Sequence, residues 1–198
     1  MLFRSIKKIF FMKLRKISIF AVVLIATYLL SSCLTCETKD YTIELNNQGG
    51  GKLTIKFNNI MSKKDKEELS KDEEIKKDFE ELTEKYMKGT EMEKSFADAK
   101  MVDKRLYKEN GKLNGIIVFE FSNFSQVKLY QYDKNSPIQY YLSSLSSESF
   151  SSSNGKQAPD YIPIVSWDKS LKKLTLSTKV TEADEKTTTS LLSLWEKQ

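Results

Sequence analysis

The sequence predicts a single α+β domain, a mainly antiparallel sheet built from hairpins with one long and two shorter helices on it. Two observations predict this class. Short runs in which apolar and polar residues alternate, as they do in strands, are separated by turn residues. A charged segment with apolar residues at helical spacing lies among these runs. Hairpins mixed with helices are typical of α+β domains, and residues 40–198 have the length of one domain.

Residues 1–32 have the pattern of a secretory signal peptide. They carry six basic side chains and no acidic one, and residues 17–30 form an uncharged apolar run. As a helix this run would span about 21 Å, short of the roughly 30 Å hydrocarbon core of a bilayer. A cleaved signal peptide is therefore favoured over an uncleaved N-terminal anchor. A start at Met12 would give a signal peptide of ordinary length, and we favour it over Met1.

The cysteine that follows has a specific context, Leu30-Ser31-Ser32-Cys33. This motif resembles the lipobox of bacterial lipoproteins. The resemblance implies that Cys33 receives a diacylglyceryl group through a thioether and that the signal peptide is cut just before it. Two or more acyl chains hold a protein stably on a membrane. The expected location is the cell envelope, with the outer membrane slightly favoured because Leu34 stands where a retention signal would have Asp.

Composition excludes several functions for the part of the chain that remains. From residue 33 onward there are 26 basic and 27 acidic residues, so the chain has no excess charge for nucleic acid. The sequence has no histidine, which excludes Ser-His-Asp and Cys-His catalysis and every zinc site that needs imidazole. We therefore predict no catalytic residues, no metal and no cofactor, and we do not expect an enzyme.

The second cysteine, Cys36, gives the spacing Cys-x-x-Cys with Cys33. A thioredoxin-like motif would need a strand before it and a helix after it, and a zinc site would need two further ligands. We predict instead that Cys36 is a free thiol close to the bilayer, in a polar lipidated tether of residues 33–39.

The first predicted elements are a hairpin and the long helix. Residues 41–45 and 53–57 alternate around a glycine-rich turn. A capping box, Ser70 with Glu73, then predicts the start of a helix, and Gly89 is placed as its C-cap. The apolar residues at helical spacing in this segment are Ile75, Phe79, Leu82 and Tyr86.

A second hairpin is predicted at Asn110-Gly111, because a type I′ turn needs positive φ at both central residues. The strand before it covers about 99–109. The strand after it, 116–121, is apolar on both faces, so we expect it to be central in the sheet. A short helix capped by Ser125 is predicted for 124–132.

The remainder of the chain is less regular. Residues 143–156 are rich in serine and predict a flexible loop, because they cannot bury enough apolar area to offset their ordering entropy. A strand is predicted for 161–167, and Pro163 indicates an edge position or a bulge there. Residues 174–176 predict another strand, and a helix is expected over 184–197.

The order of elements carries a further resemblance. A lipidated cysteine precedes a strand and a Gly-rich turn, Gln48-Gly49-Gly50-Gly51, and later come the motifs Phe121-Ser122-Asn123-Phe124, Trp167 and Lys173-Leu174-Thr175-Leu176. Over about residues 40–180 this resembles the LppM-type domain of bacterial envelope lipoproteins, which commonly have Asp-Gly-x-Gly at the first turn. The resemblance implies an envelope role involving lipid or glycolipid and no catalysis.

Two functions from different classes follow as hypotheses. The first is a binding module with an apolar groove for a lipid, glycolipid or peptide. The second is a structural or surface-exposed lipoprotein that engages an envelope protein. The candidate residues for lining the groove, for which a place in the core is the favoured alternative, are Phe119, Phe121, Phe124, Tyr130, Tyr140 and Tyr141. A cavity of several hundred Å³ would favour the binding module.

Overall fold

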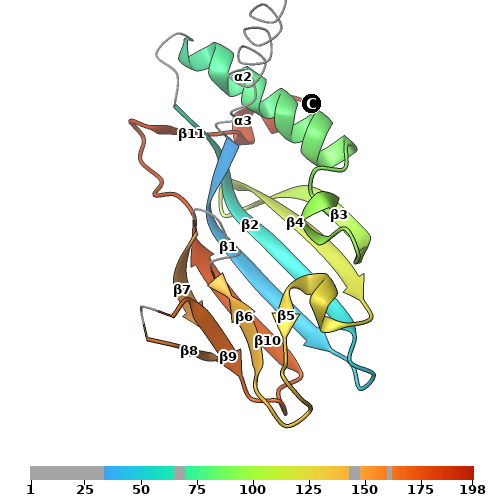
Figure 1. Ribbon diagram of the computed structural model, residues 1–198. Helices are drawn as coiled ribbons and strands as arrows, with labels where there is room; N and C mark the ends of the chain where they lie inside the picture. The colour runs from blue at the N-terminus through green and yellow to red at the C-terminus, as the bar shows by residue number, and fades with distance from the viewer. Residues whose placement is uncertain (1–33, 65–69, 143–147, 160–161) are drawn as a thin grey trace, which may run out of the picture. The chain divides into compact units, whose positions relative to one another are not determined.

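A long antiparallel sheet is the main feature of the computed structural model, which describes residues 34–64, 70–142, 148–159 and 162–198 (Figure 1). Its strands follow one another in the order β3–β4–β2–β1–β10–β7, and β11 pairs with β2. The predicted signal peptide, Met12 and the lipobox with Cys33 lie outside the described residues. The strands of this sheet are β1 (Leu34–Leu45), β2 (Gly51–Lys63), β3 (Lys100–Glu109), β4 (Lys112–Phe121), β7 (Ser149–Ser153), β10 (Lys173–Lys179) and β11 (Thr188–Ser190).

The first hairpin is confirmed, with Tyr41 opposite Ile55 and Ile43 opposite Leu53. Its strand β1, however, starts at Leu34, so the prediction of a tether up to residue 39 is wrong. Residues of this stretch pair with β2 on one side and β10 on the other; Thr38, for example, lies opposite both Asn58 and Lys179. Polar side chains do not prevent strand pairing, because the hydrogen bonds between strands are made by backbone N–H and C=O groups.

One main helix is present, and it begins as predicted. The Ser70–Glu73 capping box is formed at the start of α2 (Lys71–Glu81), which continues as a π-helical segment, η1 (Leu82–Lys88). Gly89 ends the helix in an extended conformation, where a Cβ would lie 2.5 Å from the Lys85 carbonyl oxygen. The predicted apolar stripe packs on a cluster of buried residues from the sheet and the C-terminus, namely Cys36, Ile60, Leu113 and Leu191.

The second hairpin is also confirmed. Asn110 and Gly111 have φ of 52° and 71°, as a type I′ turn requires. Strand β4 lies between β3 and β2 and is central, as expected. The helix expected over 124–132 is shorter, a 3₁₀ turn η3 (Phe124–Val127) capped by Asn123 rather than Ser125. It stops there because Lys128 adopts the left-handed conformation, with φ of 60°.

A smaller sheet packs against the lower part of the main one (Figure 1). Its order is β5–β6–β9–β8, so β9 is internal, and of the two alternatives predicted from Pro163 the edge position is wrong, while no register shift marks a bulge in β9 either. Pro163 stands just before β9, where no ladder bond is required of it. The strands of this sheet are β5 (Leu129–Tyr130), β6 (Ile138–Tyr141), β8 (Lys156–Gln157) and β9 (Ile164–Trp167).

Much of the predicted serine-rich loop is strand. Residues 143–147 lie outside the described residues, but β7 and β8 take up most of 149–157. Strand β7 pairs with β10. The Ser153 hydroxyl donates to the Thr175 carbonyl at 2.6 Å, and Phe150 packs against the core, so hydrogen bonds replace part of the missing apolar burial.

The C-terminal segment differs from its prediction as well. Instead of a helix over 184–197 it forms β11 and one short helical turn, α3 (Leu192–Trp195). Three threonines, residues 187–189, precede the turn, and β-branched residues favour strands. Leu191 is fully buried between β11 and α3. The α+β class is thus confirmed, while one main helix replaces the expected three. In the described ranges no helix combines the length and apolar character needed to cross a bilayer.

Candidate functional site

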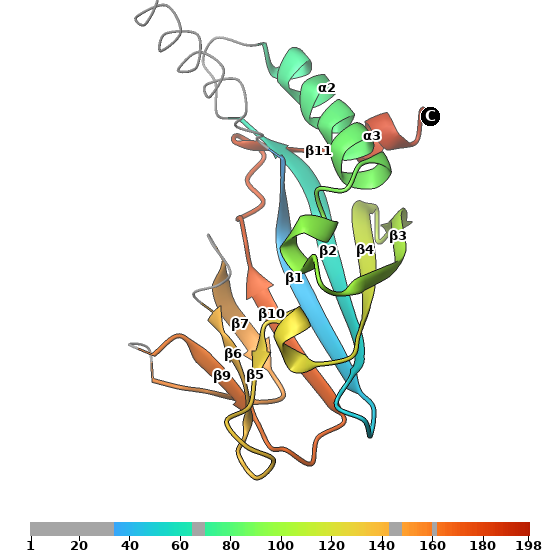
Figure 2. The ribbon, with the colours of Figure 1, turned by 45° about the vertical axis from the view of Figure 1, so that its right-hand side comes forward.

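A cavity of about 450 Å³, partly open to solvent, lies on one face of the main sheet. The helical end η1, the segment around the 3₁₀ turn η2 (Glu93–Phe96) and parts of β1, β2, β3 and β4 line it. In Figure 2 the segment between α2 and β3 crosses over this face. The apolar side chains on the sheet side include Tyr41, Ile55, Phe57, Ile60, Ile117 and Phe119. Those opposite them include Leu82, Tyr86, Met87, Met92 and Phe96.

An irregularity in β2 shapes this cavity. Asn59 has φ of 55°, and the Glu37–Asn59 position drops out of the β1–β2 ladder while the register on either side of it stays the same. Phe57 and Ile60, on either side of this position, both line the cavity.

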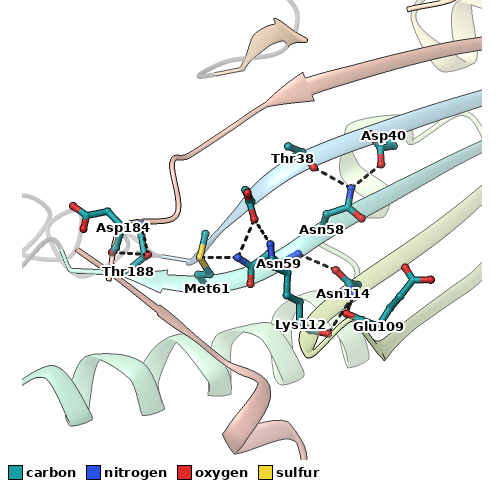
Figure 3. Close-up of polar contacts among 11 residues, drawn as sticks. Thr38, Asp40, Asn58, Asn59, Met61, Glu109, Lys112, Asn114, Asp184 and Thr188 are labelled. Atoms are coloured by element: carbon teal, nitrogen blue, oxygen red, sulfur yellow. Dashed lines mark hydrogen bonds and ion pairs between the residues drawn. The ribbon is translucent and has the colours of Figure 1, made fainter. Parts of the chain in front are cut away.

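Polar contacts hold Asn59 in this conformation (Figure 3). The Asn59 backbone N–H donates to the Asn114 side-chain oxygen at 2.9 Å, and the Asn59 amide donates to Glu37 at 3.1 Å. Lys112 donates to the same Glu37 carboxylate at 2.7 Å, and this bond lowers the pKa of Glu37.

A buried carboxylate forms part of the cavity wall. The Glu148 side chain is 4% exposed and accepts hydrogen bonds from Lys39 Nζ at 2.6 Å and Thr178 Oγ1 at 2.6 Å. The Tyr41 hydroxyl donates to it at 3.0 Å. Burial, and then the nearby Glu148 charge, raise the pKa of Tyr41, so this hydroxyl remains a donor. The carboxylate is therefore held by three donors at the edge of an apolar space.

Cys36 also lines the cavity, as a free buried thiol in β1 rather than on an exposed tether. Burial raises the pKa of this thiol to about 12, with the positive charge of Lys39 opposing and the negative charge of Glu148 adding to the shift. The thiol therefore stays protonated at neutral pH and is a poor nucleophile.

This pKa predicts that Cys36 resists alkylation. In the folded protein, iodoacetamide should modify Cys36 at least tenfold more slowly than in denaturant at about pH 9, where an ordinary thiol reacts readily. The unfolded chain loses this proton near its ordinary pKa, while the folded chain keeps it to about 12. Stability contributed by the thiol is therefore present below about pH 9 and declines as pH rises toward 12. A Cys33→Ser chain isolates the Cys36 signal, and equal rates in both states would contradict the prediction.

Cationic side chains are part of the cavity lining. Lys104 Nζ donates to the Gly89 carbonyl at 2.7 Å and pairs with Glu93 at 3.2 Å, and Arg105 pairs with Asp103. Lys128 instead makes a cation–π contact, with its ammonium 5.0 Å from the Phe96 ring centroid. An amphiphile with an apolar tail and an anionic or polyhydroxyl head would find partners for both parts here.

The predicted groove residues are only partly brought together. Phe119 lines the cavity. Phe121 and Tyr140 are buried in the core between the two sheets, and Phe124 packs partly against that core. Tyr130 and Tyr141 are 47% and 42% exposed, on strands of the smaller sheet. Of these six candidates only Phe119 lines the cavity, while the favoured alternative of a place in the core holds for Phe119, Phe121 and Tyr140, with Phe124 packed against them.

Sequence reasoning missed the opposite wall of the cavity and its first strand. Met92 and Phe96 fall after the predicted helix, in a stretch that had no assigned element. Two large apolar residues in an otherwise polar connection were the available signal. Cys36 and Lys39 were missed because the tether prediction placed them outside the domain.

Comparisons with protein-family models, curated proteins and solved structures found no match to this chain.

Proposed function

We propose that this protein is a bacterial envelope lipoprotein whose folded domain binds a single lipid or glycolipid without catalysing its conversion. The observation that carries the proposal is the cavity of about 450 Å³ with apolar side chains on both of its walls. Small-molecule sites are usually apolar clefts of about 300–1,000 Å³ with a few polar groups. Here those polar groups are Glu148, Lys39 and Lys128.

The energetics favour a chain-bearing ligand. Each methylene buried in an apolar space contributes about 0.8 kcal/mol, so even a short acyl segment gives measurable affinity. The cationic side chains of the lining suit a phosphate or sugar head group, which would remain close to water. The LppM-type resemblance supports the same ligand class.

The anchor is the second part of the proposal. The lipobox Leu30-Ser31-Ser32-Cys33 supports lipidation at Cys33, after removal of residues 1–32. The mature protein should carry diacylglyceryl at Cys33 and fractionate with membranes. A Cys33→Ser chain should lose the lipid mass and retain its signal peptide; an unchanged mass would contradict the assignment.

The ligand is tested by native mass spectrometry of the full mature protein, extracted from bacterial membranes and exchanged into a volatile buffer. We expect one additional non-covalent lipid mass beyond the covalent anchor, lost when the protein is denatured. A protein that carries only its anchor, and that takes up no added phospholipid, would count against lipid binding.

A protein partner is the alternative, and one observation favours it. Tyr130, Tyr132 and Tyr141 are exposed on or beside β5 and β6, and tyrosine is enriched in protein interfaces. If this surface binds an envelope protein, the double variant Tyr130→Ser, Tyr141→Ser should lose a defined cross-link to that protein. Its thermal stability should be unchanged.

A further inference from the structure

The cavity lies unusually close in the sequence to the proposed anchor. Strand β1 begins at Leu34, the residue after Cys33, and Leu34, Thr35 and Cys36 all line the cavity. Consecutive Cα atoms are about 3.8 Å apart. No spacer therefore separates a lipid on Cys33 from the cavity wall.

The strand is also fixed from its first residue. Leu34 lies opposite Ser62, and Thr35 lies opposite Met61, so the first two residues of β1 are already paired in the sheet. The Thr35 and Thr181 hydroxyls are 2.7 Å apart, which joins this end of β1 to the segment after β10. Two exposed lysines, Lys63 and Lys64, follow Ser62 at the same end. Anionic lipid head groups would be attracted to this end of the sheet.

We infer that this end of the sheet rests on the membrane and that the cavity takes an acyl chain directly from a phospholipid of the leaflet that carries the anchor. The inference depends on the proposed lipid binding and lipidation. It adds the source of the ligand and the surface through which it enters.

Contact with the membrane matters because of the path that the chain must follow. An acyl chain that crosses water exposes apolar surface along its whole length, which makes the crossing slow. A cavity wall that starts at Leu34, the residue after the proposed anchor, removes most of this crossing. A flexible insertion between Cys33 and Leu34 should restore the passage of the acyl chain through water.

The test inserts a twenty-residue Gly-Ser spacer between Cys33 and Leu34, which gives an average reach of about 25 Å. Lipidated protein is reconstituted in vesicles of phosphatidylethanolamine and phosphatidylglycerol. A phosphatidylglycerol with a diazirine in its acyl chain is delivered to the vesicles, and samples are irradiated after increasing delays. Mass spectrometry then follows adducts in the segment 91–106, which contributes Met92, Phe96 and Leu106 to the cavity wall.

We expect adducts in this segment to form about tenfold more slowly with the spacer. The matched control carries the same insertion after Asn47, in the exposed turn at the opposite end of the β1–β2 hairpin, and should form adducts at the wild-type rate. Equal rates for the two insertions would overturn the inference while leaving lipid binding intact. Absence of any adduct in the wild-type protein would also overturn the inference. Native mass spectrometry then tests separately whether the protein binds lipid at all.

Discussion

Replacing Gly115 by phenylalanine is expected to lower lipid affinity at least tenfold, or about 1.4 kcal/mol. Gly115 lies in β4 and lines the cavity. A Cβ at this position would lie 3.2 Å from Ile60 Cδ1 and 3.6 Å from Leu106 Cδ2, both of them ends of flexible side chains. The ring would therefore be accommodated in the cavity and occupy the space of the ligand.

The measurement is a lipid titration of the full protein followed by native mass spectrometry, together with a thermal melt. The matched control is Val102→Phe, which adds a ring on β3 at a side chain that is 41% exposed and outside the cavity lining. Gly115→Phe should bind poorly and melt within a few degrees of wild type, while Val102→Phe should bind normally. Unchanged affinity in a folded Gly115→Phe protein would show that the ligand binds elsewhere.

Trp167→Ala should have the largest effect on stability, a loss of about 3–5 kcal/mol in the free energy of unfolding. Trp167 is 1% exposed and belongs to the cluster between the two sheets. Its indole N–H donates to Asn154 at 2.9 Å, and a Cβ on Gly155 would lie 2.6 Å from the same nitrogen, so the ring is closely enclosed. Alanine would leave a cavity and would remove one of the two hydrogen bonds that the Asn154 side-chain oxygen accepts, the other coming from the Thr175 backbone N–H.

Urea unfolding followed by circular dichroism measures this loss without depending on tryptophan emission. Trp195→Ala is the control, because Trp195 is only partly buried on the smaller cluster beside α2. It should cost clearly less than Trp167→Ala. A Trp167→Ala protein with a wild-type midpoint would mean that the smaller sheet contributes little to the stability of the main one.

Local signals explain which elements could be predicted from the sequence. The Ser70–Glu73 capping box and the Asn110-Gly111 turn depend on residues a few positions apart, and both form as expected. The apolar stripe of the helix also finds its place, because helical spacing alone decides which side chains share a face.

Long-range pairing explains the elements that were missed. The start of β1 and the serine-rich β7 have few apolar residues, and each is ordered by a partner strand outside its own local segment: β2 and then β10 for β1, and β10 for β7. The cavity was missed for a related reason. It depends on the irregular Asn59 position in β2 and on Met92 and Phe96, which reach across the sheet, and neither feature follows from local periodicity.

The position of β1 has a consequence for the order of events in biogenesis. It lies between β2 and β10, and Thr38 pairs with Lys179, so the centre of the sheet cannot close before the last part of the chain is available. Such distant pairings are slow to form. The β1–β2 hairpin can form as soon as β2 is available, but β1 completes its pairing only with β10. Under the lipoprotein function proposed above, attachment of lipid at Cys33 would therefore take place before the sheet is complete.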